Sequence, residues 1–297
     1  MASVTAMSEM LIGFDAIMEI VETALYSAYI AGTIPLSVIL IGPSGGGKSK
    51  VIMQYSGSTG CHLTNDITSS GLQQLLERDY EGKIRTLVIP DFNVVLSHRS
   101  STLQLTIANL LSVTSEGTVR IDDGREKKET KHVPIGIITA MTRELYTHVA
   151  KKWAILGFNR RFLPIYFEYS METRKRVQQS ITAGSATLLQ LAPRMMHANG
   201  VMRDVEVGTN YALEIQSLSD ELSNNIGYIP MRMRQPSKDK EKSFFIGKQL
   251  EFTPHLALRS MARAHALKSG RDNVTAEDIT FITHLLDFTR FDRPGRI

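Results

Sequence analysis

Short apolar runs alternate with helix-like patterns over the first half of the chain. The two clearest runs are residues 36–41 and 86–89, which are almost entirely apolar, as in strands buried on both faces of a parallel sheet. Weaker strand patterns lie at 60–63, 133–139 and 163–167. Helical spacing falls between the strands, at 48–54, 71–78, 103–113 and 143–151. The alternation predicts an α/β fold, in which helices flank a five-stranded parallel sheet.

Helical spacing of apolar residues also dominates both ends of the chain. An amphipathic helix is expected over residues 7–30, before the first strand. After about residue 169 the strand-like runs disappear, and further helices are predicted at 172–183, 213–222, 254–268 and 276–290. We therefore expect two domains, an α/β core at 1–169 and a helical lid at 170–297, with a charged loop at 231–243.

A glycine-rich segment, residues 42–49 (GPSGGGKS), lies between the first strand and the following helix. It matches the phosphate-binding pattern G-x-x-x-x-G-K-[ST] in the strand–loop–helix context that the pattern requires. Glycines let backbone N–H groups converge on phosphate oxygens at a helix N-terminus. We expect Lys48 to bridge the β- and γ-phosphates of ATP and Ser49 to bind Mg²⁺. The predicted nucleotide-binding residues of this loop are Gly42, Pro43, Ser44, Gly45, Gly46, Gly47, Lys48 and Ser49.

A phosphate-binding loop of this kind works with a carboxylate at the end of a neighbouring strand, which holds the magnesium ion. Asp91 is the only acidic residue in the first half of the chain that directly follows an apolar strand run. We therefore assign Asp91 as the second metal-binding and catalytic residue.

These motifs, in this order, resemble the AAA+ ATPases over about residues 10–290. The resemblance implies a P-loop NTPase core followed by a helical lid, with ATP and Mg²⁺ bound between the subunits of a homo-oligomer such as a hexameric ring. In that family a glutamate that orients the attacking water usually follows the strand-end aspartate, whereas here the residue is Phe92. Asn93, Glu116 and His98 are the candidates to replace it. We expect hydrolysis to be slow, partner-dependent or absent.

The resemblance also implies roles for residues farther along the chain. Thr139 and Thr142 match the polar sensor at the end of the fourth strand. Arg161, with Arg160 as the second choice, matches the arginine finger, a permanent cation that stabilises charge at the nucleotide of a neighbouring subunit. Arg259 is the nearest match to the arginine that the family's lid contributes to the nucleotide site.

Residues 110–124 (LLSVTSEGTVRIDDG) resemble the AAA+ branch with a β-hairpin before the sensor strand, which includes MCM helicases, MoxR proteins and bacterial enhancer-binding activators. Residues 258–279 are similar to the lid of MoxR and MCM proteins. The hairpin arms are expected at 118–121 and 131–135, with the tip at 122–130. In MCM-like rings such hairpins grip DNA, in the activators they contact protein, and a solvated tip is the third alternative. The predicted nucleic-acid contacts are Arg125, Lys127, Lys128 and Lys131.

Composition and charge restrict the class of protein without selecting a partner. The chain is 42% hydrophobic and 22% charged, as in folded globular proteins. The net charge of +4 permits an acidic partner such as nucleic acid. Cys61 is the single cysteine, which excludes an intramolecular disulfide. Because no uninterrupted apolar run reaches about 20 residues and residues 1–10 lack signal-peptide features, we expect no membrane association and a cytoplasmic location.

Two functions remain open at this point. The first is an AAA+ ATPase whose nucleotide state drives remodelling or movement of nucleic acid. The alternative is a protein-remodelling chaperone of the MoxR kind, or a partner-regulated nucleotide switch with slow or no hydrolysis. A separately encoded partner protein is expected in either case, because little of the chain lies outside the core and the lid.

Overall fold

The computed structural model describes residues 12–79, 81–122, 127–182, 201–231, 242–245 and 252–297. It is an α/β structure built around a sheet in which every pair of neighbouring strands is parallel. The strands, in spatial order, are β10 (Gly295–Arg296), β7 (Phe162–Glu168), β1 (Ser37–Gly42), β6 (Gly136–Thr142), β3 (Thr86–Ile89) and β2 (Cys61–Leu63).

The predicted α/β class and parallel sheet are confirmed, but the predicted number of strands is wrong. The sixth strand, β10, joins the sheet by main-chain pairing of Gly295 with Phe167 and of Arg296 with Glu168. The N–H of Ile297 then donates to the carbonyl of Glu168. A strand of two residues has no side-chain periodicity to detect, so this pairing has no signal in the hydrophobic pattern.

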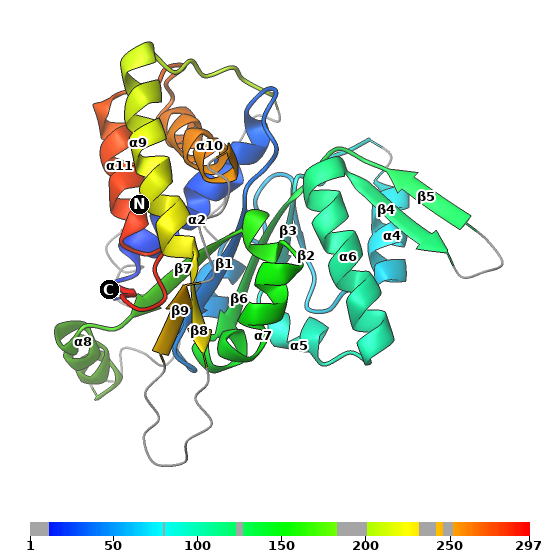
Figure 1. Ribbon diagram of the computed structural model, residues 1–297, viewed down its shortest axis with the longest axis horizontal. Helices are drawn as coiled ribbons and strands as arrows, with labels where there is room; N and C mark the ends of the chain where they lie inside the picture. The colour runs from blue at the N-terminus through cyan, green and yellow to red at the C-terminus, as the bar shows by residue number, and fades with distance from the viewer. Residues whose placement is uncertain (1–11, 80, 123–126, 183–200, 232–241, 246–251) are drawn as a thin grey trace.

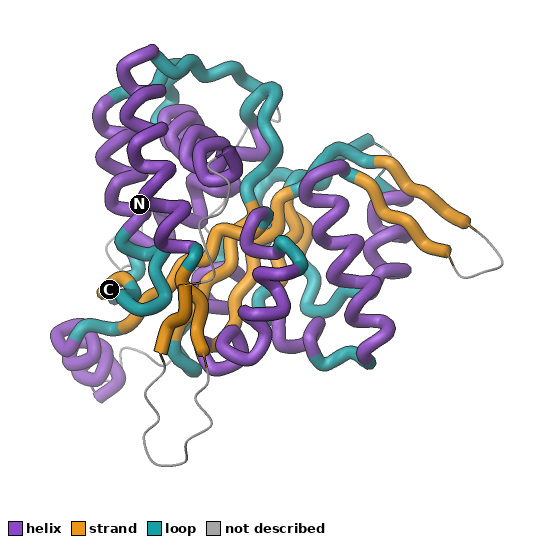
Figure 2. The backbone as a smooth tube through the Cα atoms, in the orientation of Figure 1, coloured by secondary structure: helices purple, strands orange, loops and turns teal. Residues whose placement is uncertain are grey.

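Helices cover both faces of the sheet (Figures 1 and 2). One face packs against α2 (Asp15–Tyr26) and α3 (Lys48–Met53). The opposite face packs against α4 (Ser69–Arg78), α5 (Phe92–Leu96), α6 (Ser100–Glu116) and α7 (Arg143–Ile155). Two hydrophobic cores therefore share the sheet, because alternate residues of each buried strand point to opposite faces. The N-terminal helix is shorter than the predicted 7–30, and residues 7–11 of that prediction lie outside the described residues.

The C-terminal half is mainly helical, as predicted. Its helices α9, α10 and α11 belong to the same hydrophobic cluster as α2 and one face of the sheet. Lid and core are thus joined by a continuous apolar interior. The helices of this half are α8 (Met171–Thr182), α9 (Thr209–Ile226), α10 (Phe252–Lys268) and α11 (Ala276–Leu286).

Two antiparallel strand pairs stand outside the main sheet. The first is the hairpin of β4 (Thr118–Asp122) and β5 (Lys127–Lys131), which extends away from the sheet (Figure 1). Its second arm lies at 127–131 rather than at the predicted 131–135. The second pair is β8 (Tyr228–Met231) with β9 (Lys242–Phe245). It brackets the predicted charged loop, most of which lies outside the described residues.

Gly117 explains where the first hairpin starts. It ends α6 with a positive φ of 65°, and a Cβ at this position would lie 1.9 Å from the carbonyl oxygen of His132. A side chain is therefore excluded, and the Gly117 carbonyl accepts a hydrogen bond of 2.7 Å from the N–H of His132. This contact closes the hairpin base one residue after Lys131, so β5 must end there.

None of the helices in the described parts of the chain combines the length and the apolar character needed to cross a membrane.

Candidate functional site

The glycine-rich residues 42–49, called the phosphate loop from here on, turn from the end of β1 into the start of α3. Gly47 takes a left-handed conformation with φ of 74° immediately before Lys48, the first residue of α3. At Gly46, a Cβ would lie 2.8 Å from the carbonyl oxygen of Pro43. Both positions therefore need glycine, one for its backbone angle and one for lack of space. The result is a tight loop at a helix N-terminus, where N–H groups are unpaired.

Lys48 folds back over this loop. Its Nζ donates to the carbonyl oxygens of Gly42, at 3.1 Å, and of Pro43, at 2.6 Å. Burial lowers the pKa of the Lys48 ammonium, while the negative charges of Glu144 and Asp91 oppose that shift. The ammonium is thus held at the loop by acceptors that phosphate oxygens could replace.

Ser49 and Asp91 lie at the same edge of the sheet. The hydroxyl of Ser49 donates to the carbonyl oxygen of Pro90, at 2.9 Å, and Pro90 directly precedes Asp91. Asp91 is exposed and caps α5, where its Oδ1 accepts a hydrogen bond of 3.0 Å from the N–H of Asn93. The structure therefore brings together two segments that are more than forty residues apart.

Hydroxyl and carboxylate oxygens are ligands that suit Mg²⁺, which usually keeps several waters and binds substrate phosphates as well. Ser49 and Asp91 fit that donor set. Across the described residues, no three His, Cys, Asp or Glu side chains gather closely enough to hold a metal ion by themselves. A divalent ion at this edge would therefore need ligands besides Ser49 and Asp91.

The two threonines predicted as sensors occupy different positions. Thr142 is the last residue of β6 and pairs with Gly42, the first residue of the phosphate loop. Its hydroxyl caps α7 by accepting from the N–H of Leu145, at 3.3 Å. Thr139 pairs instead with Ile39 and lies fully buried inside the sheet.

At about 3.3 Å per residue, Thr139 lies roughly 10 Å before the end of its strand. The structure therefore does not bring Thr139 to the phosphate loop. The Thr139 hydroxyl has no hydrogen-bond partner among the described residues. The sequence pattern stopped at residue 139 because Thr looks like a strand end, whereas β6 continues through Ala140 and Met141.

Phe92 is fully buried and packs edge-on against Trp153 and Phe158, with ring centroids 5.6 and 6.1 Å away. It therefore supports the core and presents nothing to solvent. Of the candidates to replace the missing glutamate, Glu116 adjoins Ser115, which lines a pocket at the opposite edge of the sheet. His98 is engaged with Asp66, at 2.8 Å.

Asn93 stays beside Asp91, and its buried Oδ1 has no partner in the described part of the chain.

Glu144 was missed in the sequence. It is exposed in the first turn of α7, two residues after the end of β6. Its negative charge opposes the lowering of the Lys48 pKa by burial, so Glu144 lies within electrostatic range of the phosphate loop. Its position shortly after a predicted strand could have identified it as a candidate in the sequence.

An aromatic support behind the phosphate loop was also missed. The hydroxyl of Tyr169 donates to the carbonyl oxygen of Gly46, at 3.0 Å. The ring of Phe14 meets those of Tyr169 and Phe167 edge-on, with centroids 5.9 and 5.4 Å away. Burial raises the pKa of Tyr169, so this hydroxyl remains a donor. Phe14 is far from Phe167 and Tyr169 in the sequence, so no local pattern marks the cluster.

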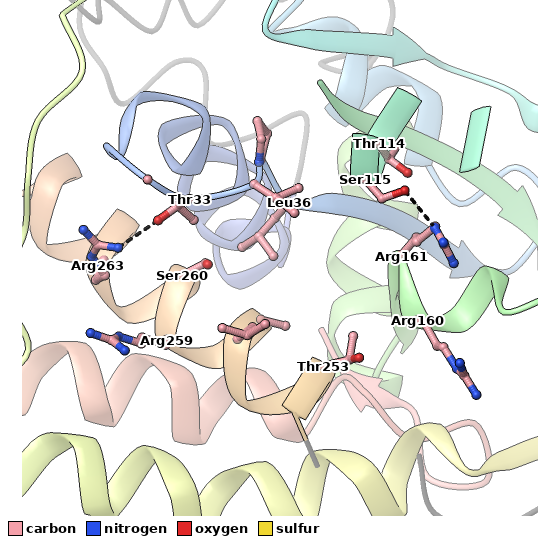
Figure 3. Close-up of a pocket in the computed structure, with 15 residues that line it drawn as sticks. Thr33, Leu36, Thr114, Ser115, Arg160, Arg161, Thr253, Arg259, Ser260 and Arg263 are labelled. Carbon is pink, nitrogen blue, oxygen red and sulfur yellow. Dashed lines mark hydrogen bonds between the residues drawn. The ribbon is translucent and has the colours of Figure 1, made fainter. Parts of the chain in front are cut away.

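The predicted arginines lie at the opposite edge of the sheet from the phosphate loop. Arg160 and Arg161 precede β7, and together with Arg259 and Arg263 of α10 they line a cavity of about 630 Å³ (Figure 3). We call this cavity the arginine pocket. It adjoins the residues before β1, so six strand residues, or roughly 20 Å, separate it from the phosphate loop.

Arg259 was predicted as the lid arginine of the nucleotide site, and the structure places it in the arginine pocket, away from the phosphate loop of its own chain. The helical spacing of the lid identified α10 but not the edge of the sheet against which α10 packs. Arg161 is half-buried and donates to the hydroxyl of Ser115, at 3.4 Å.

The hairpin residues are placed in part. Lys131 is exposed at the end of β5, while Lys127 and Lys128 belong to the same strand and pair with Asp122 and Ile121. Arg125 lies outside the described residues. The hairpin base is tied to the end of α4, where His132 Nε2 lies 3.0 Å from Asp79 Oδ2.

Neither the models of known protein families nor the curated proteins compared with this sequence give a match.

Proposed function

We propose that this chain binds Mg-ATP at the phosphate loop and hydrolyses it as an AAA+-type ATPase, in an oligomer whose active sites lie between subunits. The observation that carries the proposal is the juxtaposition of Lys48, Ser49 and Asp91 at the carboxyl edge of a parallel sheet. Ligands of open α/β sheets bind at this edge.

Each residue then has a defined role. Loop N–H groups and Lys48 bind the phosphates, and Lys48 gives up its contacts with Gly42 and Pro43 to do so. Ser49 and Asp91 hold Mg²⁺, which when bound neutralises charge on the transferred phosphoryl group. Glu144, whose negative charge acts on Lys48, is the carboxylate that we assign to orient the attacking water.

The positions of the arginines support the proposed oligomer. Because Arg161 is roughly 20 Å from the phosphate loop of its own chain, it cannot contact a nucleotide bound at that loop, and as an arginine finger it would act on the phosphate loop of another chain. An arginine supplied in this way stabilises the charge that develops during phosphoryl transfer. A neighbouring subunit would thus complete each site.

For the coupled substrate we propose nucleic acid, contacted by the β4–β5 hairpin. The hairpin projects from the sheet (Figure 1), and its described residues include the predicted contacts Lys127, Lys128 and Lys131. The second candidate is a slow, partner-regulated switch that acts on protein. It is favoured by the burial of Phe92 at the position of the usual glutamate.

The test is ATP turnover, measured as phosphate release with and without single- and double-stranded DNA, together with a sizing column. We expect Asp91→Asn to reduce turnover by about a hundredfold or more. The matched control is Asp220→Asn, which removes an exposed carboxylate on α9 and should leave turnover unchanged.

Stimulation by DNA that Asp91→Asn abolishes would support the DNA-acting ATPase. ATP binding without turnover, and without a response to DNA, would favour the partner-regulated switch. Absence of ATP binding at millimolar concentrations would reject both.

A further inference from the structure

The arginine pocket is a cavity between the lid and the core, and its volume of about 630 Å³ falls in the range typical of small-molecule sites. Arg259 and Arg263 of α10 line one side of it, and Arg160 and Arg161, from the turn before β7, line the other side (Figure 3). Among the described residues that line it there are four arginines and no Asp or Glu.

One of the four arginines is already neutralised within the fold. Arg263 Nη2 lies 2.8 Å from Asp204 Oδ1, and the same guanidinium donates to the Val205 carbonyl and to Thr33 Oγ1, each at 2.8 Å. These bonds tie α10 to the segments beside it. Arg263 is therefore a structural residue at the rear of the pocket.

The other three arginines have no acidic partner among the described residues. The Arg161 guanidinium donates to a neutral hydroxyl, that of Ser115, and no hydrogen bond or ion pair joins the side chain of Arg160 or Arg259 to another described residue. Burial lowers the pKa of Arg263, and the nearby positive charge of Arg259 adds to that effect. Arg160 and Arg259 are exposed and Arg161 is half-buried, so the three guanidinium groups are accessible to an anionic ligand.

The walls between the arginines are apolar. Ile34 and Leu256 line the pocket while keeping 52% and 60% of their surface exposed, and Leu36 and Ala257 lie beside them. Exposed aliphatic side chains next to guanidinium groups suit a ligand with an apolar or aromatic part and a strongly anionic part. Arginine binds phosphate through two parallel hydrogen bonds and stacks on planar rings.

We propose that the arginine pocket is a second anion site, which binds the phosphate groups of a free nucleotide-sized phosphorylated molecule within a single chain. Arg160 and Arg161 bind it from the core and Arg259 from the lid. The ligand therefore bridges the two halves of the molecule and holds α10 against the start of β7. It also occupies Arg161, the residue that would otherwise reach the nucleotide of a neighbouring chain.

The test separates this site from the phosphate loop. Lys48→Ala, which disables the loop, is titrated with inorganic triphosphate and with ATP by calorimetry, at a protein concentration at which a sizing column shows monomer. We expect one molecule bound per chain. Arg160→Gln and Arg259→Gln, each added to Lys48→Ala, should weaken that binding by about tenfold or more.

The matched control is Arg174→Gln, which removes an exposed arginine on α8 outside the pocket and should leave the affinity unchanged. No binding by folded Lys48→Ala, binding that requires a second copy, or binding that is insensitive to both pocket variants would overturn the proposal.

If circular dichroism shows that Lys48→Ala is unfolded, the number of ATP molecules bound per wild-type chain decides. Two ATP molecules bound per wild-type chain, reduced to one in Arg259→Gln, would support the second site. One ATP molecule bound per chain in both proteins would reject it. The proposed ATPase fails in a different way, if Lys48→Ala folds and loses no bound nucleotide relative to the wild type.

Discussion

The two edges of the central sheet, for each of which we propose a phosphate ligand, are built by different physical means. At the carboxyl edge, residues 42–49 form a tight loop at a helix N-terminus, and one lysine folds back over it. At the amino edge, arginines from two separate segments line a partly apolar cavity. The first site depends on local backbone geometry, which is encoded by adjacent residues. The second depends on how the lid is placed on the core, which is a property of the whole fold.

The largest expected effect concerns Arg161, which lies at the amino edge but is proposed to act at the carboxyl edge of a neighbouring chain. If its side chain serves a neighbouring chain, Arg161→Ala should lower ATP turnover by about a thousandfold without changing ATP affinity at the phosphate loop. Steady-state phosphate release and nucleotide binding measure the two effects. Mixing Arg161→Ala with Lys48→Ala should restore part of the turnover, because some mixed interfaces carry both intact residues. No recovery on mixing would contradict a shared site.

Glu144 tests whether the carboxyl edge contains its own water-orienting carboxylate. Glu144→Gln should reduce single-turnover hydrolysis by about a hundredfold while ATP still binds, since the phosphate contacts belong to other residues. Glu172→Gln, at the exposed start of α8, is the matched control. Equal hydrolysis rates in the wild type and Glu144→Gln would remove Glu144 from the mechanism.

Phe92 tests whether the residue after Asp91 is structural. Phe92→Ala removes a fully buried ring from its contacts with Trp153 and Phe158. The expected loss is about 3 kcal/mol of unfolding free energy, measured by urea denaturation. Val94→Ala, on an exposed face of the same helix, should cost under about 0.5 kcal/mol. A small effect at Phe92 would mean that this position is not part of the core.

The smallest expected effect concerns the charges that hold α10 against α2. A hydrogen bond from His265 is the largest cause that lowers the pKa of Glu19, to about 2. Because this folded-state pKa lies below the ordinary value of 4.5, the Glu19 contribution is present above pH 4.5 and is lost as the pH falls toward 2. Glu19 is 44% exposed, so screening limits this contribution to about 1 kcal/mol.

Thermal unfolding between pH 3 and pH 6 measures this effect. Glu19→Gln should lower the midpoint at pH 6 and make the midpoint less sensitive to acid. Glu214→Gln, at an exposed position of α9, is the control.

The contribution of His265 depends on pH in the opposite direction. Burial alone would lower the pKa of His265, but hydrogen bonds to Asp278 and Glu19 outweigh burial and raise the pKa. The contribution of His265 to stability is therefore present at low pH and is lost as the pH rises through this raised pKa.

Parts of the fold that depend on neighbouring residues were predictable. The apolar runs located β1 and β3 because a strand buried on both faces needs apolar residues at nearly every position. The start of α11 was equally local, since Thr275 and Asp278 form a capping box within four residues. The positions that failed depend on pairing across the fold, as with Thr139, whose distance from the loop follows from the register of β6 against β1.

By itself, then, the sequence determined the phosphate loop, the alternation of strands with helices and the position of Asp91, because each depends on residues that are adjacent in the chain. Only the tertiary structure decided that Glu144 lies near Lys48, that β10 adds a sixth strand, and that Arg160, Arg161 and Arg259 meet in one cavity. The physical reason is that these contacts arise from strand order and from the packing of α10 on the core. No local spacing of residues encodes either of them.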